Sequence, residues 1–279
     1  DILTYHVIAD KVDAATAVSS AGSKVTMVNG DSVGLSLDGD NLLVNTVTVT
    51  ATDIMADNGI IHVIDAVLMP PTDKGMPTAN IVETAVTAGT FNTLVAALQA
   101  TNLDTVLADE SKMYTVFAPT DDAFAMLGEE TINTLLANTD VLSSILLQHV
   151  VMGEVDSVTA FTLNGMEAET ASGAKLPVSI NSETDSLMFG GAKIVTKDIY
   201  TTNGIIHVID AVIVGDVSVP EPVGNIVDVA SQAGSFNTLL IAAAAADLAE
   251  VLADESATYT VFAPTDAAFA QLPESTLNA

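Results

Sequence analysis

Histidine and aspartate are the side chains of this sequence that could carry chemistry, and they recur at a fixed spacing. The ten-residue run NGIIHVIDAV occurs at 58–67 and again, unchanged, at 203–212. The two copies contain four titratable residues: His62, Asp65, His207 and Asp210. A histidine paired with an aspartate can move a proton in catalysis, and clustered histidines and carboxylates can bind a metal ion. Two further histidines, His6 and His149, each precede one copy.

The sequence around these residues favours a structural role over a catalytic one. His62 lies between two β-branched residues in a run typical of a β-strand, where a ring nitrogen usually bonds a backbone carbonyl and holds the strand in place. An aspartate at a strand end can likewise accept bonds from backbone amides, and no serine stands in a G-x-S-x-G elbow. We therefore expect no enzymatic activity. A metal site would require the pairs His6–His62 or His149–His207 to meet in space.

Aspartates in a second repeated run are placed to cap helices. YTVFAPTDDAFA at 114–125 returns as YTVFAPTDAAFA at 259–270. After the proline that ends each β run, a threonine offers an N-cap hydroxyl and an aspartate occupies the first helical turn, where the dipole favours a carboxylate. These residues are Thr120, Asp121, Thr265 and Asp266. The acidic DGDN at 38–41 lacks the EF-hand pattern, so we expect a hairpin turn, no cofactor and only loose Ca²⁺ association.

The elements that position these residues belong to a long repeat. The two NGIIHVIDAV runs and the two YTVFAP runs are each 145 residues apart, a period typical of repeated domains. Stretches rich in Pro, Gly and charge read as linkers at 71–79 and 216–224. They bracket a complete domain at 80–215. The segment 1–70 then corresponds to the C-terminal half of a domain, and 225–279 corresponds to the N-terminal half.

The complete unit has helical hydrophobic spacing in its first half and β-strand alternation in its second half. Residues 80–110 carry apolar residues at helical spacing, YTVFAP at 114–119 predicts a short strand, and the runs at 140–151 and 239–253 predict further helices. The second half is β-rich, with Gly, Asn and Asp between the runs. A helical first half and a β second half predict the α+β class.

Three motifs in this order resemble those of the fasciclin, or FAS1, domain family. TVFAPTDDAF at 115–124 is similar to the family's first signature, NGIIHVIDAV to its second, and Tyr5–His6 to the tyrosine-histidine motif between them. The complete unit departs from the pattern, because it has Gln148–His149 at that motif. The resemblance implies the FAS1 fold, with helices packed on a β-sandwich or wedge, in tandem repeats. It also implies cell adhesion and binding of partner proteins or polysaccharides.

The net negative charge makes nucleic acids and anionic membranes poor partners for this chain. Asp and Glu number 36 against seven basic residues, all of them Lys, for a net charge of −29. Nucleic-acid binding requires a basic face, and an anionic membrane surface would repel this chain, so neither is an expected partner. No run of about 18 apolar residues predicts a membrane-spanning helix. So acidic a composition is suited to a saline exterior, where counterions screen the repulsion.

These features together predict an extracellular, secreted structural or adhesive protein, part of a bacterial array, matrix, biofilm or filament. The alternative is a carrier of a small apolar ligand such as a carotenoid, and a hydrolase is a third hypothesis. A lone half-domain would expose an apolar sheet edge. We therefore expect 225–279 to be completed by a segment like 1–70, and 1–70 by a segment like 225–279. The completing segment belongs either to another copy of the same protein, joined head to tail, or to one longer polypeptide. That junction would lack counterparts of only nine residues, 135–143.

Overall fold

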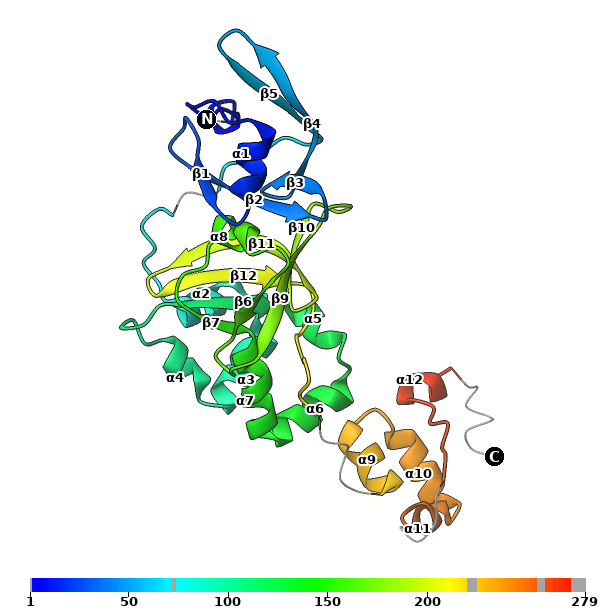
Figure 1. Cartoon of the computed structure of the whole chain (residues 1–279). Helices are drawn as coiled ribbons and strands as arrows, with labels where there is room; N and C mark the ends of the chain where they lie inside the picture. The colour runs from blue at the N-terminus through cyan, green and yellow to red at the C-terminus, as the bar shows by residue number, and fades with distance from the viewer. Residues whose placement is uncertain (1, 72–73, 220–224, 255–258, 272–279) are drawn as a thin grey trace. The chain divides into compact units, whose positions relative to one another are not determined.

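The computed structural model describes residues 2–71, 74–219, 225–254 and 259–271. They form two compact units, and Figure 1 shows the path of the chain through its elements. The first unit joins Asp1–Leu127 with Thr139–Val217, and the second joins Gly128–Asn138 with Ser218–Ala279. We call residues 2–71 the N-terminal half-module, the rest of the first unit the central module, and residues 225–271 the C-terminal segment.

The N-terminal half-module is built on one antiparallel sheet. It begins with a 3-10 turn, Thr4–His6, and a short helix, α1 (Ala14–Ser19). Five strands follow: β1 (Lys24–Thr26), β2 (Ser32–Asp38), β3 (Asn41–Val44), β4 (Val47–Ala56) and β5 (Gly59–Ile64). Each strand pairs with the next in order β1-β2-β3-β4-β5. β5 is therefore an edge strand, and Figure 1 shows it in a hairpin with β4 that projects from this half-module.

The central module combines helices with a larger sheet. Its helices are α2 (Ile81–Ala88), α3 (Asn92–Ala100), α4 (Leu103–Leu107), α5 (Asp121–Ala125), α7 (Thr139–Gln148) and α8 (Ser157–Thr162). Its strands are β6 (Tyr114–Pro119), β7 (Val150–Met152), β8 (Met166–Glu169), β9 (Lys175–Asn181), β10 (Ser186–Phe189), β11 (Ala192–Thr201) and β12 (Gly204–Ile209). The sheet runs β7-β6-β12-β11-β10-β9-β8, and only its β6–β12 pair is parallel. The α+β class is confirmed.

Local sequence explains where the first helix begins and ends. Asn80 accepts the Glu83 amide and Glu83 bonds back to the Asn80 amide, a complete capping box, and Gly89 ends α2 at φ 69°. The helix predicted at 140–151 is wrong at its end. α7 stops at Gln148, because the next residues, Val150–Met152, pair with β6 as strand β7.

One core cluster of the central module lies among its strands and is closed by α8, which contributes Ala160 and Phe161. It contains large side chains from several strands, and the rings of Phe117 and Phe189 stack with centroids 3.7 Å apart. Leu43 of the N-terminal half-module is fully buried in the same cluster. The half-module has a smaller cluster of its own, made by Tyr5, Met27, Val33, Val47 and Leu68.

The second unit is helical in the residues that are described. It contains α6 (Glu129–Ala137), α9 (Ile226–Ala233), α10 (Asn237–Ala245), α11 (Leu248–Leu252) and α12 (Asp266–Phe269). The continuous helix predicted at 239–253 is wrong, because Asp247 at φ 59° separates α10 from α11. Residues 259–264, YTVFAP, form no strand, although the same letters make β6 in the central module.

The repeat-based boundaries remain a prediction. The structure groups 128–138 with the C-terminal segment, whereas the repeat assigns these residues to the complete domain at 80–215. Both predicted linkers, 71–79 and 216–224, contain residues outside the described ranges, and so does the predicted joining of Ala279 to Asp1. No described helix combines the length and apolar character needed to cross a bilayer.

Candidate functional site

His149 joins the end of a helix to the segment that follows the last strand. Its Nδ1 lies 2.9 Å from the Ile145 carbonyl of α7, and the Ile213 amide donates to its Nε2 at 2.9 Å. The ring is therefore neutral, with its proton on Nδ1. Complete burial lowers the pKa of His149 to about 4, although the Ile145 carbonyl opposes that shift.

His207 makes a second bridge, from the centre of β12. Its Nε2 donates to the Val155 carbonyl at 2.8 Å, just before α8, and the Asp198 amide lies 3.3 Å from its Nδ1. Burial lowers the pKa of His207, so this ring too is held neutral. Both histidines of the central module thus bond backbone through each of their nitrogens.

The N-terminal half-module repeats both bridges in a more exposed setting. His6 lies 2.8 Å from the Ile2 carbonyl and accepts the Leu68 amide at 2.9 Å, as His149 does with its own partners. His62 lies 2.9 Å from the Val12 carbonyl through Nε2. The half-module therefore holds its strands by the same means as the central module.

The predicted aspartates bind backbone amides. Asp65 accepts the Thr48 amide at 3.0 Å and Asp210 accepts the Lys193 amide at 2.9 Å, each joining the end of one strand to the start of its neighbour. These bonds close the β4–β5 and β11–β12 pairs at the end away from the hairpin turn.

The helix-capping residues Thr120 and Asp121 bond two different helices. Thr120 caps α5 by accepting the Ala123 amide, but the Asp121 carboxylate reaches back to the Thr93 amide at the start of α3, at 2.7 Å. Burial raises the pKa of Asp121, and the bonds from Thr93 and Asn92 outweigh that effect and lower it overall. Asp121 therefore connects two helices as well as occupying the first turn of one.

The C-terminal segment repeats this arrangement. Thr265 accepts the Ala268 amide, and Asp266 accepts the Thr238 amide at 2.6 Å. Hydrogen bonds from Thr238 and then Asn237 lower the pKa of Asp266 to about 2. Asp266 therefore connects α12 to α10 as Asp121 connects α5 to α3.

The structure adds a buried carboxylate that sequence analysis did not single out. Asp198 accepts the Ser157 amide at 2.8 Å and makes a short hydrogen bond with the Ser157 hydroxyl, which fixes the start of α8. Its φ of 59° lies in the left-handed region. Asp53 has the same φ and accepts the Ala14 amide at the start of α1. The 145-residue repeat relates the two aspartates and is the signal that would have found them.

The departure at the tyrosine-histidine motif changes a buried contact. The Tyr5 hydroxyl donates to the Ser32 carbonyl and accepts from Asn45, in the N-terminal half-module. At the corresponding place Gln148 donates to the Val214 carbonyl at 3.1 Å. Its Oε1 is buried, without a partner among the described residues. The glutamine therefore packs at the motif without reproducing the hydroxyl network.

Comparison with known proteins settles the family. The sequence profile of the fasciclin domain matches residues 1–70, 89–215 and 234–279, most of the chain. The chain belongs to the fasciclin domain family. The resemblance inferred from the three motifs is confirmed, and the fold is that of tandem FAS1 modules.

The fasciclin relatives include animal and bacterial proteins. Transforming growth factor-beta-induced protein ig-h3 of Sus scrofa is 32% identical, over 62% of this chain and 24% of that protein. Human periostin is 29% identical, over 81% of this chain and 25% of periostin. This chain therefore spans about a quarter of the length of each. Uncharacterized protein sll1735 of Synechocystis is 42% identical over 48% of this chain and 96% of its own length. A solved FAS1 domain pair from the insect cell adhesion molecule fasciclin I covers 78% of this chain and 81% of its own, at 19% identity and a TM-score of 0.46.

The buried histidine rings of the central module are already engaged in hydrogen bonds with the backbone. Each ring nitrogen of His149 and His207 already faces a backbone group. Among the described residues, no group of three or more His, Asp or Glu side chains is placed to hold a metal ion. Neither the family description nor the names of these relatives denotes an enzyme. DGDN at 38–41 is a hairpin turn in which Asp38 lies opposite Asn41 and accepts the Ser182 hydroxyl at 2.9 Å.

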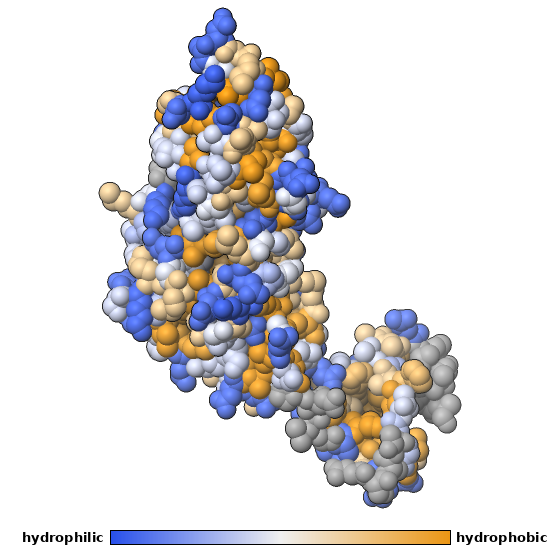
Figure 2. Space-filling model, viewed as in Figure 1, coloured by the Kyte–Doolittle hydropathy of each residue, from blue (hydrophilic) through white to orange (hydrophobic). Residues whose placement is uncertain are grey.

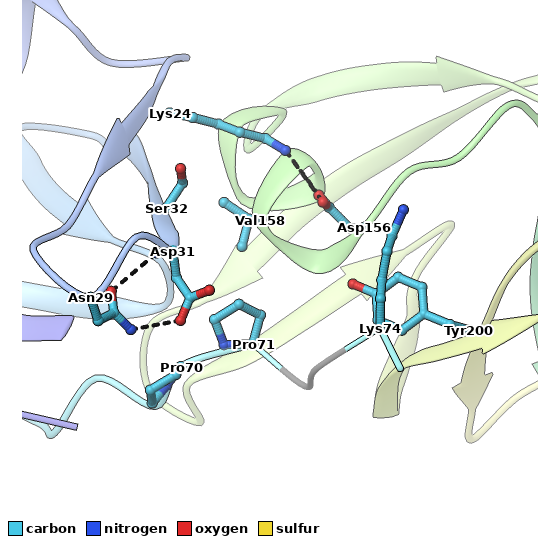
Figure 3. A pocket seen from close by; sticks show the side chains of 10 residues that line it. All are labelled: Lys24, Asn29, Asp31, Ser32, Pro70, Pro71, Lys74, Asp156, Val158 and Tyr200. Atoms are coloured by element: carbon cyan, nitrogen blue, oxygen red, sulfur yellow. Dashed lines mark hydrogen bonds and ion pairs between the residues drawn. The ribbon is translucent and has the colours of Figure 1, made fainter. Parts of the chain in front are cut away.

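A hollow of the first unit lies where the N-terminal half-module meets the central module, and Figure 3 shows its lining. Its volume is about 710 Å³. At its rim Lys24 of the half-module bonds Asp156 of the central module at 3.1 Å. Partial burial raises the pKa of Asp156, but the Thr159 bonds and the Lys24 ammonium lower it overall. The ion pair therefore joins the two parts beside an open, polar hollow.

Proposed function

We propose that this chain is a structural or adhesive protein of the cell exterior, made of tandem FAS1 modules. The observation that carries the proposal is the use of the motif side chains: histidine, aspartate and threonine alike bond backbone and fix strands and helices to one another. A protein whose signature residues maintain its shape is suited to bearing load and presenting surface. The family relationship supports the same class, as the solved domain pair comes from a cell adhesion molecule.

The charge supports a saline exterior and shapes how the protein binds. With a net charge of −29, two copies repel each other at low salt. The Debye length falls from about 30 Å at 0.01 M to about 8 Å at 0.15 M ionic strength, so repulsion between surfaces weakens in salt water. An adhesive protein of this composition therefore binds other copies, surface proteins or polysaccharides better as salt rises. Calcium, bound loosely by exposed carboxylates, would act in the same direction.

The test is adhesion measured against salt. Beads coated with the chain are retained under flow on surfaces that bear the same chain or an uncharged polysaccharide, from 0.01 to 0.5 M NaCl. We expect retention to increase several-fold across this range, and beads coated with heat-unfolded chain serve as the control. Retention that equals the control at every salt concentration would contradict the adhesive function.

Carriage of a small apolar ligand is the alternative function. The core of the central module leaves only about 10 Å³ beside Phe117 and Phe189, which holds no such ligand. The C-terminal segment has an open apolar groove of about 400 Å³, lined by α9, α10 and residues 259–263. A carotenoid in that groove would give purified protein a visible absorption band, and colourless protein that takes up no added carotenoid would rule the alternative out.

A further inference from the structure

The hollow between the N-terminal half-module and the central module has the size and the lining of a binding site. Its volume of about 710 Å³ lies within the range of about 300–1,000 Å³ that is typical of small-molecule sites. The half-module contributes Lys24, Asn29 and Asp31, and the central module contributes Asp156 and Tyr200. The hollow is open to solvent, so it accepts an internal segment of a polymer as readily as a free small molecule.

The side of the hollow formed by the half-module also faces solvent in a complete module. The strand register makes Ser172 of the central module the counterpart of Asn29, and Ser172 is exposed. Ala174 is the counterpart of Asp31, and it is half-buried. The central module contains both a helical half and a β half, yet neither covers this turn. The other side of the hollow, with Tyr200, belongs to the central module itself, so the hollow is a property of the junction.

A carboxylate on the half-module side is fixed in place with one oxygen left over. The Asn29 side-chain amide donates to Asp31 Oδ2 at 2.6 Å, and the Asp31 backbone amide donates to Asn29 Oδ1 at 3.1 Å. Within the described ranges, Oδ1 of Asp31 accepts no hydrogen bond. Asp31 therefore presents a preorganised acceptor, and the second N–H of the Asn29 amide lies beside it as a donor.

The central module presents a phenol on the other side. Figure 3 shows the Asp31 carboxylate and the Tyr200 hydroxyl on opposite sides of the hollow, each turned toward the space between them. The Tyr200 hydroxyl has no hydrogen-bond partner in the part of the chain that the structure describes, and the Lys74 ammonium lies 5.3 Å from the centroid of its ring. Burial, followed by the charges of nearby carboxylates, raises the pKa of Tyr200. The hydroxyl therefore keeps its proton and can donate it in a hydrogen bond.

The charges that line the hollow are balanced. Lys24 donates to Asp156 at 3.1 Å, and the same carboxylate accepts the Thr159 amide at 2.7 Å. With Lys74 and Asp31, the described lining has two positive and two negative side chains. The net charge of −29 repels an anion, and the described residues offer no cluster of three or more His, Asp or Glu for a metal ion. The hollow therefore favours a neutral ligand over an ion.

Flat apolar groups alternate with these polar ones. The Tyr200 ring, Pro70, Pro71 and the buried Val158 all face the hollow. Figure 2 shows hydrophilic and hydrophobic residues intermixed over the visible face of the first unit, and the hollow has the same mixed character on a smaller scale. A sugar ring matches such a lining, because each hydroxyl both donates and accepts and the C–H face packs on flat apolar groups.

We propose that this hollow binds a short segment of a neutral polysaccharide, with Asp31 accepting from sugar hydroxyls and Tyr200 donating to them. The inference rests on the proposed adhesive function and names the class of polysaccharide and the site that holds it. Because the two residues stand on different parts of the first unit, the bound segment contacts both parts and holds them together.

The first experiment measures binding by isothermal titration calorimetry in 0.15 M NaCl. The probes are neutral tetrasaccharides of glucose, mannose, galactose and xylose, and the anionic comparison is tetragalacturonate. We expect at least one neutral probe to bind the unaltered chain about tenfold more tightly than tetragalacturonate does. A panel without a neutral binder overturns the proposal, and so does tighter binding of the anion.

Two variants test whether the probe occupies this hollow. Asp31→Asn keeps an acceptor for the Asn29 amide but replaces the spare acceptor by a donor, and Tyr200→Phe removes only a hydroxyl. The first should weaken binding by at least about tenfold and the second by about threefold, with unchanged circular dichroism and melting temperature. Asp40→Asn, in the exposed β2–β3 turn, and Tyr259→Phe, in the C-terminal segment, are the matched controls. Equal affinity of the variants and the controls overturns the assignment to this hollow.

The second experiment maps the contact by NMR of the ¹⁵N-labelled chain. We expect the neutral probe to shift amide resonances of the turn at 29–32 and of Tyr200 in β11, while those of α2 stay unchanged. Shifts confined to one part of the first unit overturn the bridging contact. Shifts confined to the apolar groove of the C-terminal segment place the ligand there and overturn the proposal.

Two outcomes separate this inference from the proposed function. In the flow assay, beads coated with Asp31→Asn chain that adhere to the polysaccharide like the unaltered chain refute the site and leave the adhesive function standing. A chain that binds the probe in the hollow but is not retained on either surface keeps the site and loses the adhesive function.

Discussion

The buried histidine bridge predicts a specific loss of stability in acid. His149 has a folded-state pKa of about 4 and is fully buried, whereas an unfolded histidine has a pKa of 6.5. Because the unfolded chain takes up the proton first, the stability from this group is complete above pH 6.5 and falls as the pH drops toward 4. The whole difference corresponds to about 3 kcal/mol, at 1.36 kcal/mol per pKa unit, and about 2 kcal/mol of it is lost by pH 5.

The geometry explains why protonation is so costly. The Ile213 amide donates to Nε2, so a proton on that nitrogen would replace a hydrogen bond by a contact between two donors. His149→Gln removes the titration while keeping a polar side chain. At pH 7.5 it should cost about 1–3 kcal/mol, because the Ile213 amide or the Ile145 carbonyl loses its buried partner.

The assay is urea unfolding of both chains from pH 7.5 to 4.5, followed by circular dichroism. Subtracting the variant from the unaltered chain cancels the effect of the many carboxylates, which the two share. We expect the stability difference to shrink by about 2 kcal/mol between pH 7 and pH 5, and the protection factor of the Ile213 amide against hydrogen exchange to fall in step. A difference that does not change with pH, or an NMR titration of His149 near 6.5, would refute the reasoning.

Three further perturbations test other contacts. Asp198→Ala leaves the Ser157 amide and hydroxyl without their buried partner, so it should lower the free energy of unfolding by about 2–4 kcal/mol in a urea titration. The exposed counterpart Asp53 is the control, and Asp53→Ala should lower the free energy of unfolding by less than about 1 kcal/mol. Gly34→Ala places a Cβ 2.9 Å from the Phe161 Cβ, so amide exchange in α8 should accelerate while exchange in α2 stays unchanged. Raising NaCl from 0.01 to 0.5 M should raise the melting temperature, because it screens a charge of −29; a flat response in scanning calorimetry would show that the charges do not destabilise the fold.

Local sequence was sufficient for the helix caps of the central module, although it did not separate strand β7 from the end of α7. Asn80 and Gly89 bound the first helix as their types predict, and Thr120 caps the next short helix. The fate of a repeated strand was not predictable in this way. YTVFAP is a buried strand at 114–119 and an exposed, unpaired segment at 259–264, because a strand requires a partner that its own letters do not supply.

The buried polar contacts illustrate a second limit. Asp198 and Asn203 do much to hold the central module together, and each has an identical counterpart 145 residues earlier. Comparison of the copies would have identified both residues. It would not have shown that one member of each pair is buried and the other exposed, since burial depends on which elements pack around each copy.

The N-terminal half-module and the β-rich half of the central module share the NGIIHVIDAV run but differ in one strand pair, β1–β2 in the first and β8–β9 in the second. In the N-terminal half-module Lys24 lies opposite Gly34 in the β1–β2 pair. The lysine bonds Asp156, and the glycine fits against α8, where an added Cβ would lie 2.9 Å from a carbonyl oxygen.

The corresponding pair in the central module is Glu167 opposite Pro177, in strands β8 and β9. A glutamate there would repel an aspartate like Asp156, and a proline ring cannot approach a helix as closely as glycine does. The β8–β9 pair of the central module therefore has neither the charge nor the shape to make the contact that Lys24 and Gly34 make with α8 and the residue before it.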